Sequence, residues 1–154
     1  MKNIPRSMND QTTTIADLRK RIQEFRLKRG WTKEDPKDIA LSLILEASEL
    51  LEHFQWLTGE EVARNTKIKE AISEEMSDVL WWLINLGTRL NIDIAAAFER
   101  KLAKNVVKYP EKLFSPTMTE KEQTHEYYKI KAATRGGHPL YEPEKAKTEN
   151  LEKK

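Results

Sequence analysis

Apolar side chains recur every three or four positions along most of the first 110 residues, a spacing that predicts α-helices rather than strands. The predicted helices run from near Thr14 to Gly30, and over about 38–57, 68–90 and 94–108. Neither strand-like alternation nor an Asn-Gly or Asp-Gly hairpin dipeptide occurs. Four helices joined by short connections predict an all-α fold, a four-helix bundle subunit.

Several residues mark where these helices begin and end. Thr14 is placed to cap the first helix, with Asp17 three residues further on to complete a capping box. Asp93 is the expected N-cap of the fourth helix, and Tyr109-Pro110 ends it. Residues 60–66 are polar and are expected to form a connection.

The polar and prolyl segments divide the chain into three parts. Residues 1–13 lack periodicity and predict a flexible leader, residues 14–113 form the helical domain, and residues 114–154 form a charged extension. Thr119 and Glu122 predict a capping box for a short helix within the extension. The last dozen residues are expected to be a solvated tail, with a docking arm for another subunit as the alternative.

Composition narrows the class of protein. With 38% hydrophobic and 34% charged residues, either part of the chain is disordered or a partner subunit completes the core. The 27 basic and 25 acidic residues nearly balance, so binding to a nucleic-acid polymer is not expected. Cysteine is absent, which excludes disulfides. No segment is typical of a signal peptide or a membrane span, and we expect a cytoplasmic protein.

The second predicted helix carries its acids on two different faces. On a helical projection Glu46 falls inside the apolar stripe and Glu49 at its edge, whereas Glu52 falls on the polar face. Burying two unpaired carboxylates is costly, and at i and i+3 they also repel each other. A divalent cation relieves both penalties, and oxygen ligands favour Mg²⁺, with Mn²⁺ as an option. The alternative is pairing with lysine or arginine from another helix.

The third predicted helix repeats this spacing with Glu75 and Asp78. These acids project beside the apolar arc rather than within it, so a solvated acidic face is the alternative. Trp81 and Trp82 flank Asp78, and large aromatic side chains are unusual on a solvated face. Glu74 is expected to face water. Two such pairs on neighbouring antiparallel helices predict a four-carboxylate metal site.

These motifs resemble a known family. EASE at residues 46–49, 25 intervening residues and EMSD at residues 75–78 match the ExxE…ExxD signature of the MazG-like all-α pyrophosphohydrolases. EASELLEHFQW, EEMSDVL and KLAKNVVKYP bring the likeness closest to the dCTP pyrophosphatase group. The resemblance covers about residues 15–110. It implies a four-helix subunit that assembles as a homodimer or homotetramer.

The resemblance also implies an activity, the hydrolysis of a (deoxy)nucleoside triphosphate, such as dCTP or a modified pyrimidine nucleotide, to the monophosphate and pyrophosphate. Mg²⁺ would be held by Glu46, Glu49, Glu75 and Asp78, and Glu46 or Glu49 would act as the catalytic base. Some dCTP-preferring members carry histidine where this chain has Ile22, so the base preference stays open. The positions that match nucleotide-binding residues are Trp31, Trp56, Trp82, Lys101, Asn105 and Tyr109.

Two other functions fit an acidic helical bundle. A di-iron or di-manganese bundle would carry paired E-x-x-H motifs, but His53 follows Glu49 by four residues and Glu52 by one. We therefore interpret His53 as a polar core or interface residue. A non-catalytic helical oligomeric interaction module would use its acids as salt-bridge partners, and metal would not change its stability.

Overall fold

The computed structural model describes residues 7–133 of the 154-residue chain. All regular secondary structure in that range is helical, which confirms the all-α fold class. The elements are α1 (Ile15–Leu27), α2 (Pro36–Glu52), α3 (Gly59–Arg64), α4 (Thr66–Arg89), α5 (Ile94–Lys108), the 3₁₀ turn η1 (Glu111–Leu113) and α6 (Glu120–Ala133).

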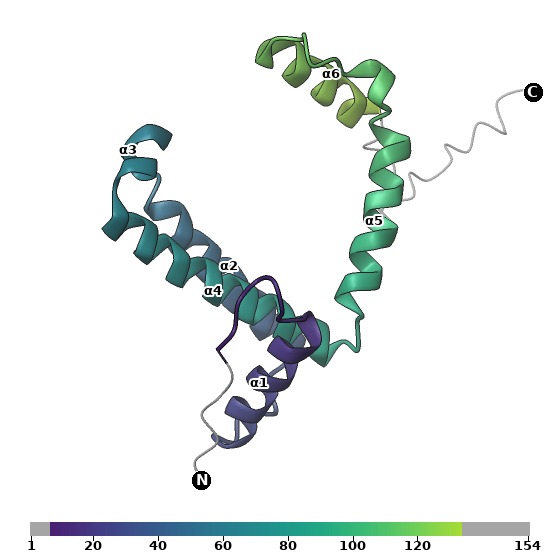
Figure 1. The fold of residues 1–154 in the computed structure, drawn as a ribbon. Helices are drawn as coiled ribbons and strands as arrows, with labels where there is room; N and C mark the ends of the chain where they lie inside the picture. Colours follow the sequence, from purple (N-terminus) through teal and green to yellow (C-terminus); the bar gives the residue numbers. More distant parts are fainter. Residues whose placement is uncertain (1–6, 134–154) are drawn as a thin grey trace, which may run out of the picture. The chain divides into compact units, whose positions relative to one another are not determined.

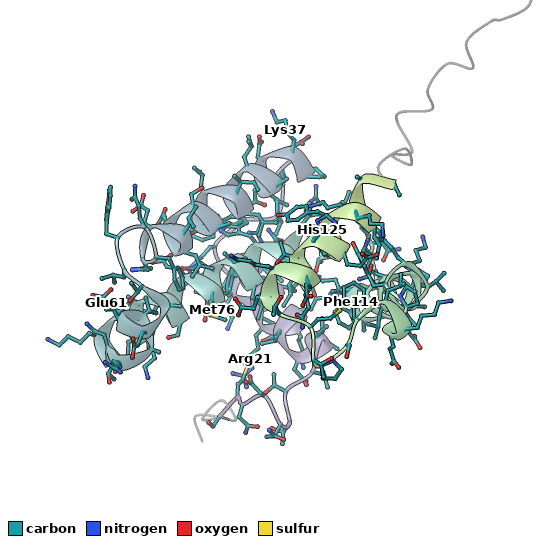
Figure 2. All side chains as sticks on the ribbon, turned by 90° about the horizontal axis from the view of Figure 1, so that it is seen from above. Arg21, Lys37, Glu61, Met76, Phe114 and His125 are labelled. Carbon is teal, nitrogen blue, oxygen red and sulfur yellow. The ribbon has the colours of Figure 1, made fainter. Side chains whose placement is uncertain are left out.

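The chain forms two compact units, Met1–Ala97 and Phe98–Lys154. In the first unit, α2 and α4 lie side by side and antiparallel, with α3 at the turn between them (Figure 1). Figure 2 shows Lys37, at the start of α2, at the opposite end of this pair from Glu61 of α3. Because α1, α2 and α3 all contact α4, α4 is the central helix of this unit.

Local capping accounts for where α1 begins and ends. The Thr14 hydroxyl accepts a hydrogen bond from the Asp17 amide at 3.1 Å, and the Thr14 amide donates to the Asp17 carboxylate at 2.9 Å. This reciprocal pair confirms the predicted capping box. After Leu27 the chain turns through Gly30, whose φ of 72° lies in the left-handed region that favours glycine.

The prediction for α2 was wrong at both ends. Asp35 accepts a hydrogen bond from the Lys37 amide at 2.8 Å, so the helix begins at Pro36, which suits a first turn that needs no N–H. The helix ends at Glu52, and the next amides bond carbonyls three residues back in tight turns. The predicted polar connection also contains α3, which starts from a capping box of Thr58 and Glu61.

The core of the first unit is small. Its buried apolar side chains are those of Ile22, Ile39, Val62, Ile72 and Ile84. Gly87 of α4 admits the chain that leads into α5, because a Cβ there would stand 2.9 Å from Ile94 Cδ1. Asp93 caps α5 as predicted, accepting a hydrogen bond from the Ala96 amide at 3.0 Å.

The second unit is held together by aromatic rings. Tyr109, which follows α5, stacks on Tyr127 of α6 with ring centroids 5.5 Å apart, and meets Phe114 edge-on at 6.3 Å. The predicted capping box of α6 is present, with the Thr119 amide 2.7 Å from the Glu122 carboxylate. The predicted charged tail lies outside the described residues, as do residues 1–6 of the predicted leader.

Many large apolar side chains are exposed to solvent in this single chain. They lie mainly on α2 (Leu41, Ile44, Leu45 and Leu51) and on α5 (Phe98, Leu102, Val106 and Val107). Contiguous apolar surface of this kind marks interaction sites in soluble proteins. In the described part of the chain, no helix is both long enough and apolar enough to cross a membrane.

Candidate functional site

The predicted acidic site forms where α2 and α4 pack together. Carboxylate oxygens of Glu46, Glu75 and Asp78 lie within 4.8 Å of one another. Glu46 and Glu75 are half-buried, and Asp78 is exposed. Two oxygens on opposite sides of Mg²⁺ stand about 4.2 Å apart, so small side-chain rotations bring these three oxygens around one ion. The donor set therefore fits a hard divalent cation.

Basic side chains do not neutralise this cluster. Among residues 7–133, none of Glu46, Glu49, Glu75 and Asp78 forms an ion pair with lysine or arginine. Pairing of these acids with basic residues from another helix is therefore absent from the described part of the chain. The closely spaced negative charges repel one another and leave a demand for a cation.

The pKa of Glu75 reports this repulsion. Burial is the largest cause that raises its pKa, followed by the negative charges of Glu49, Asp78 and Glu46. His53 acts in the opposite sense and lowers the pKa. The folded, metal-free protein therefore holds a proton at Glu75 more tightly than an isolated glutamate does.

Two neighbours of the cluster differ from the sequence interpretation. Glu49 was expected to point into the bundle, but it is exposed and lies outside the three-residue cluster, while remaining near enough to act on Glu75. His53, the C-cap of α2, is half-buried beside the same cluster, a proximity that its spacing did not reveal. Glu52 and Glu74 are exposed, as predicted.

Trp82 connects α4 to the acid on α2. Its indole Nε1–H donates a hydrogen bond to Glu46 Oε1 at 3.1 Å, and this bond is partly buried. Arg26 of α1 lies 5.9 Å from the centroid of the Trp82 ring and forms an ion pair with Glu34. Trp82 thus fixes the orientation of a candidate metal ligand, a role that its match to a nucleotide-binding position did not suggest.

The other tryptophans occupy different environments. Trp31 is 52% exposed, meets Phe25 edge-on and lines a cavity beside α1 and α4. Trp81 packs edge-on against Phe25 at 5.2 Å, which explains an aromatic residue next to Asp78. Trp56 follows α2, is 85% exposed and does not line that cavity. Trp31 therefore lines a cavity while staying exposed and Trp82 is half-buried, whereas Trp56 is almost fully exposed.

The remaining predicted nucleotide-binding residues lie in the second unit. Lys101 is exposed and Asn105 half-buried, and both belong to α5, one turn apart. The Tyr109 amide bonds the Asn105 carbonyl at 2.8 Å, and its ring packs in the aromatic cluster described above. Lys101 and Asn105 can therefore contact one ligand, whereas Tyr109 already serves the packing of α6.

The chain is similar to known proteins. The profile of the MazG-like family matches residues 41–123, more than half of the chain and the whole acidic site. This chain belongs to the MazG-like family. The membership confirms the family resemblance seen in the two carboxylate pairs.

Individual proteins are also similar to this MazG-like chain. It is 37% identical to human dCTP pyrophosphatase 1 and 36% identical to the rat protein, each over 101 residues, or 63% of this chain. The match spans 59% of the length of those relatives. A crystal structure of a pyrophosphatase from Archaeoglobus fulgidus superposes with a TM-score of 0.58 at 35% identity, covering 68% of this chain and 99% of that one.

Proposed function

We propose that this MazG-like protein hydrolyses a (deoxy)nucleoside triphosphate to the monophosphate and pyrophosphate with the help of Mg²⁺. The observation that carries the proposal is the convergence of three carboxylates from α2 and α4, none of which forms an ion pair with lysine or arginine among residues 7–133. The similarity to dCTP pyrophosphatase 1 and to a solved pyrophosphatase supports the reaction type. It also favours dCTP, or a modified pyrimidine triphosphate, as the substrate.

Glu46, Glu75 and Asp78 would hold the ion, and Trp82 would keep Glu46 in place. Mg²⁺, or Mn²⁺ in its place, would neutralise charge on the phosphates and lower the pKa of a bound water. Second-shell donors such as an indole N–H orient metal ligands and sustain metal affinity. Glu46, Glu75 and Asp78 would thereby supply the electrostatic part of the reaction from carboxylate oxygens that already lie within 4.8 Å of one another.

Glu49 is the proposed general base. It is exposed and outside the three-oxygen cluster, yet near enough to influence the pKa of Glu75. A carboxylate that is not occupied as a ligand is free to accept a proton from the attacking water. Glu46, the alternative base, already accepts the hydrogen bond from Trp82.

Lys101 and Asn105 are proposed to contact the phosphates or the sugar. They lie at i and i+4 on α5, so they present a cation and an amide to the same side of the helix. A lysine ammonium acts there as a point charge that offsets phosphate charge. The KYP tyrosine, Tyr109, would support this region mainly by packing.

Self-association as a homodimer or homotetramer is also proposed. The exposed apolar side chains of α2 and α5 are more than a small soluble monomer usually leaves in contact with water. Burying them against another copy would complete the small core. Light scattering coupled to gel filtration measures the mass, and a monomer at micromolar concentration would contradict this part of the proposal.

The decisive assay is incubation of the full chain with each (d)NTP and Mg²⁺, followed by ion-exchange chromatography. We expect monophosphate and pyrophosphate from the wild type and from Glu52→Gln, whose carboxylate lies on the solvated face of α2. Asp78→Asn is expected to form neither product. Release of diphosphate and orthophosphate would mean that another phosphoanhydride bond is cut.

A further inference from the structure

A cavity of about 520 Å³ lies beside α1, the loop after it and the C-terminal half of α4. Its walls include Arg26, Trp31, Asn85, Thr88 and Arg89. All of these residues belong to the first unit, as does the acidic cluster. The volume falls in the range of ordinary small-molecule sites, which bind with few but well-placed polar groups.

Three other polar residues of these walls already have partners. Arg26 is ion-paired with Glu34, and Arg89 Nε donates to the Glu34 carbonyl at 3.1 Å. The Thr88 hydroxyl donates to the Ile84 carbonyl at 2.8 Å. These groups shape the cavity while their main hydrogen bonds stay within the protein.

Asn85 is different. Its side chain is 4% exposed, and its Nδ2 is buried with no hydrogen-bond acceptor in the part of the chain that the structure describes. Buried amide groups are normally satisfied, because leaving one unpaired costs the hydrogen bonds that it made with water. A buried amide facing a cavity without a partner is a polar group prepared for a ligand.

The position of Asn85 relates this cavity to the acidic site. Asn85 follows Asp78 by seven residues, two helical turns, so both project from the same face of α4. The axial distance between them is about 10 Å. Trp82 lies between them on the same face and contacts both Arg26 and Glu46. The phosphates of a nucleotide at the carboxylates would therefore place its base towards Asn85.

We propose that Asn85 reads the Watson–Crick edge of a cytosine base, an inference that rests on the proposed function. Nδ2 donates to the ring nitrogen N3, and Oδ1 accepts from the exocyclic amino group. Such bidentate amide contacts discriminate between bases by satisfying an adjacent acceptor and donor together. Trp31, at the mouth of the cavity, supplies an aromatic surface for the ring. Asn85 is thus a specificity-determining residue of the nucleotide site.

The test compares dCMP binding to the wild type, Asn85→Leu and Ser73→Ala, followed by tryptophan fluorescence without hydrolysis. Asn85→Leu keeps the shape of the side chain but loses both hydrogen bonds, and we expect dCMP affinity to fall about 10- to 100-fold. Ser73→Ala is the control, since that exposed hydroxyl lies on α4 outside the cavity. Its affinity is expected to match the wild type.

Thermal unfolding without ligand separates recognition from structure. Because Nδ2 has no partner within the residues that the structure describes, the Tm of ligand-free Asn85→Leu is expected to equal or exceed that of the wild type. A lower Tm would identify Asn85 as a structural residue and overturn the inference. So would unchanged dCMP affinity in the variant, or a wild type that does not bind dCMP.

The two proposals fail separately. A wild type that binds dCMP through Asn85 but releases no pyrophosphate from any (d)NTP would end the proposed hydrolysis and leave base recognition standing. A wild type that hydrolyses dCTP, with a KM and kcat that Asn85→Leu does not alter, would leave the hydrolysis standing and remove Asn85 from the site.

Discussion

Two sites on one face of α4, the acidic cluster and the buried amide of Asn85, both contain unfavourable interactions, but of different kinds. At the acidic cluster, the carboxylates of Glu46, Glu75 and Asp78 lie close together and repel one another. At Asn85, the buried Nδ2 has no hydrogen-bond acceptor in the described part of the chain. Charge repulsion depends on pH, salt and metal, whereas an unpaired amide depends on none of these. Changes that affect one of these sites and not the other therefore test whether one ligand contacts both.

Asp78→Asn is expected to produce the largest difference between the two sites, measured as the loss of activity against the loss of dCMP affinity. Removing one negative ligand should reduce pyrophosphohydrolase activity about 10³-fold or more, since a bound metal contributes several kcal/mol and each 1.36 kcal/mol is tenfold in rate. The measurement is kcat/KM for dCTP in Mg²⁺. The affinity for dCMP, measured by fluorescence titration in EDTA, should remain close to that of the wild type. Equal losses of activity and of dCMP affinity would mean that the two sites are not separable.

A smaller loss is expected from Trp82→Phe. This change keeps an aromatic ring but removes the hydrogen bond from Nε1 to Glu46. Outer-shell donors of this kind are worth about 10- to 100-fold in metal affinity. Titrating activity against Mg²⁺ concentration measures the shift. Activity that is restored by high Mg²⁺ identifies a positioning role, whereas a loss that Mg²⁺ cannot restore would contradict it.

The pH dependence of the unfolding free energy of the metal-free protein should report on the acidic cluster alone. The pKa of Glu75 is raised in the folded state, so folding is favoured while Glu75 is protonated and loses that contribution as pH rises through the raised pKa. In EDTA, the difference in unfolding free energy between the wild type and Glu75→Gln should shift against the wild type over that window. Urea titrations at pH values from about 4 to 8 measure it.

Two other glutamates also make stability depend on pH. Hydrogen bonds from Thr58 and Thr119 lower the pKa values of Glu61 and Glu122, so these two residues stabilise the fold more as pH rises. Because both are present in the wild type and in Glu75→Gln, their contributions cancel in the difference.

Adding Mg²⁺ should raise the Tm of the wild type, and Asp78→Asn should abolish that rise. A wild-type melting curve that Mg²⁺ does not change would favour the alternative function, a non-catalytic helical interaction module.

The smallest effect is expected from Thr14→Ala, which belongs neither to the acidic cluster nor to the cavity around Asn85. Losing the capping hydrogen bond to the Asp17 amide should lower the unfolding free energy by about 1 kcal/mol. Activity and dCMP affinity per folded molecule should not change. A change in either would show that α1 transmits strain to the cavity that it lines.

The sequence determined the features that arise within a single helix. The Thr14–Asp17 and Thr119–Glu122 capping boxes were predictable because their partners stand three residues apart. The box that starts α3 from Thr58 and Glu61 has the same local signature, although the polar composition of this segment predicted a connection. The likeness to the MazG-like family also followed from the sequence, through the two carboxylate pairs and the EASELLEHFQW, EEMSDVL and KLAKNVVKYP motifs.

Only the tertiary structure decided which side chains meet. The rotation and axial offset of α2 against α4 place Glu46, but not Glu49, with Glu75 and Asp78, and they direct Trp82 onto Glu46. The packing of α1 against α4 accompanies the burial of Asn85, whose Nδ2 has no acceptor among residues 7–133. Spacing along a chain fixes the face of one helix, but distances between helices depend on how all their side chains pack together.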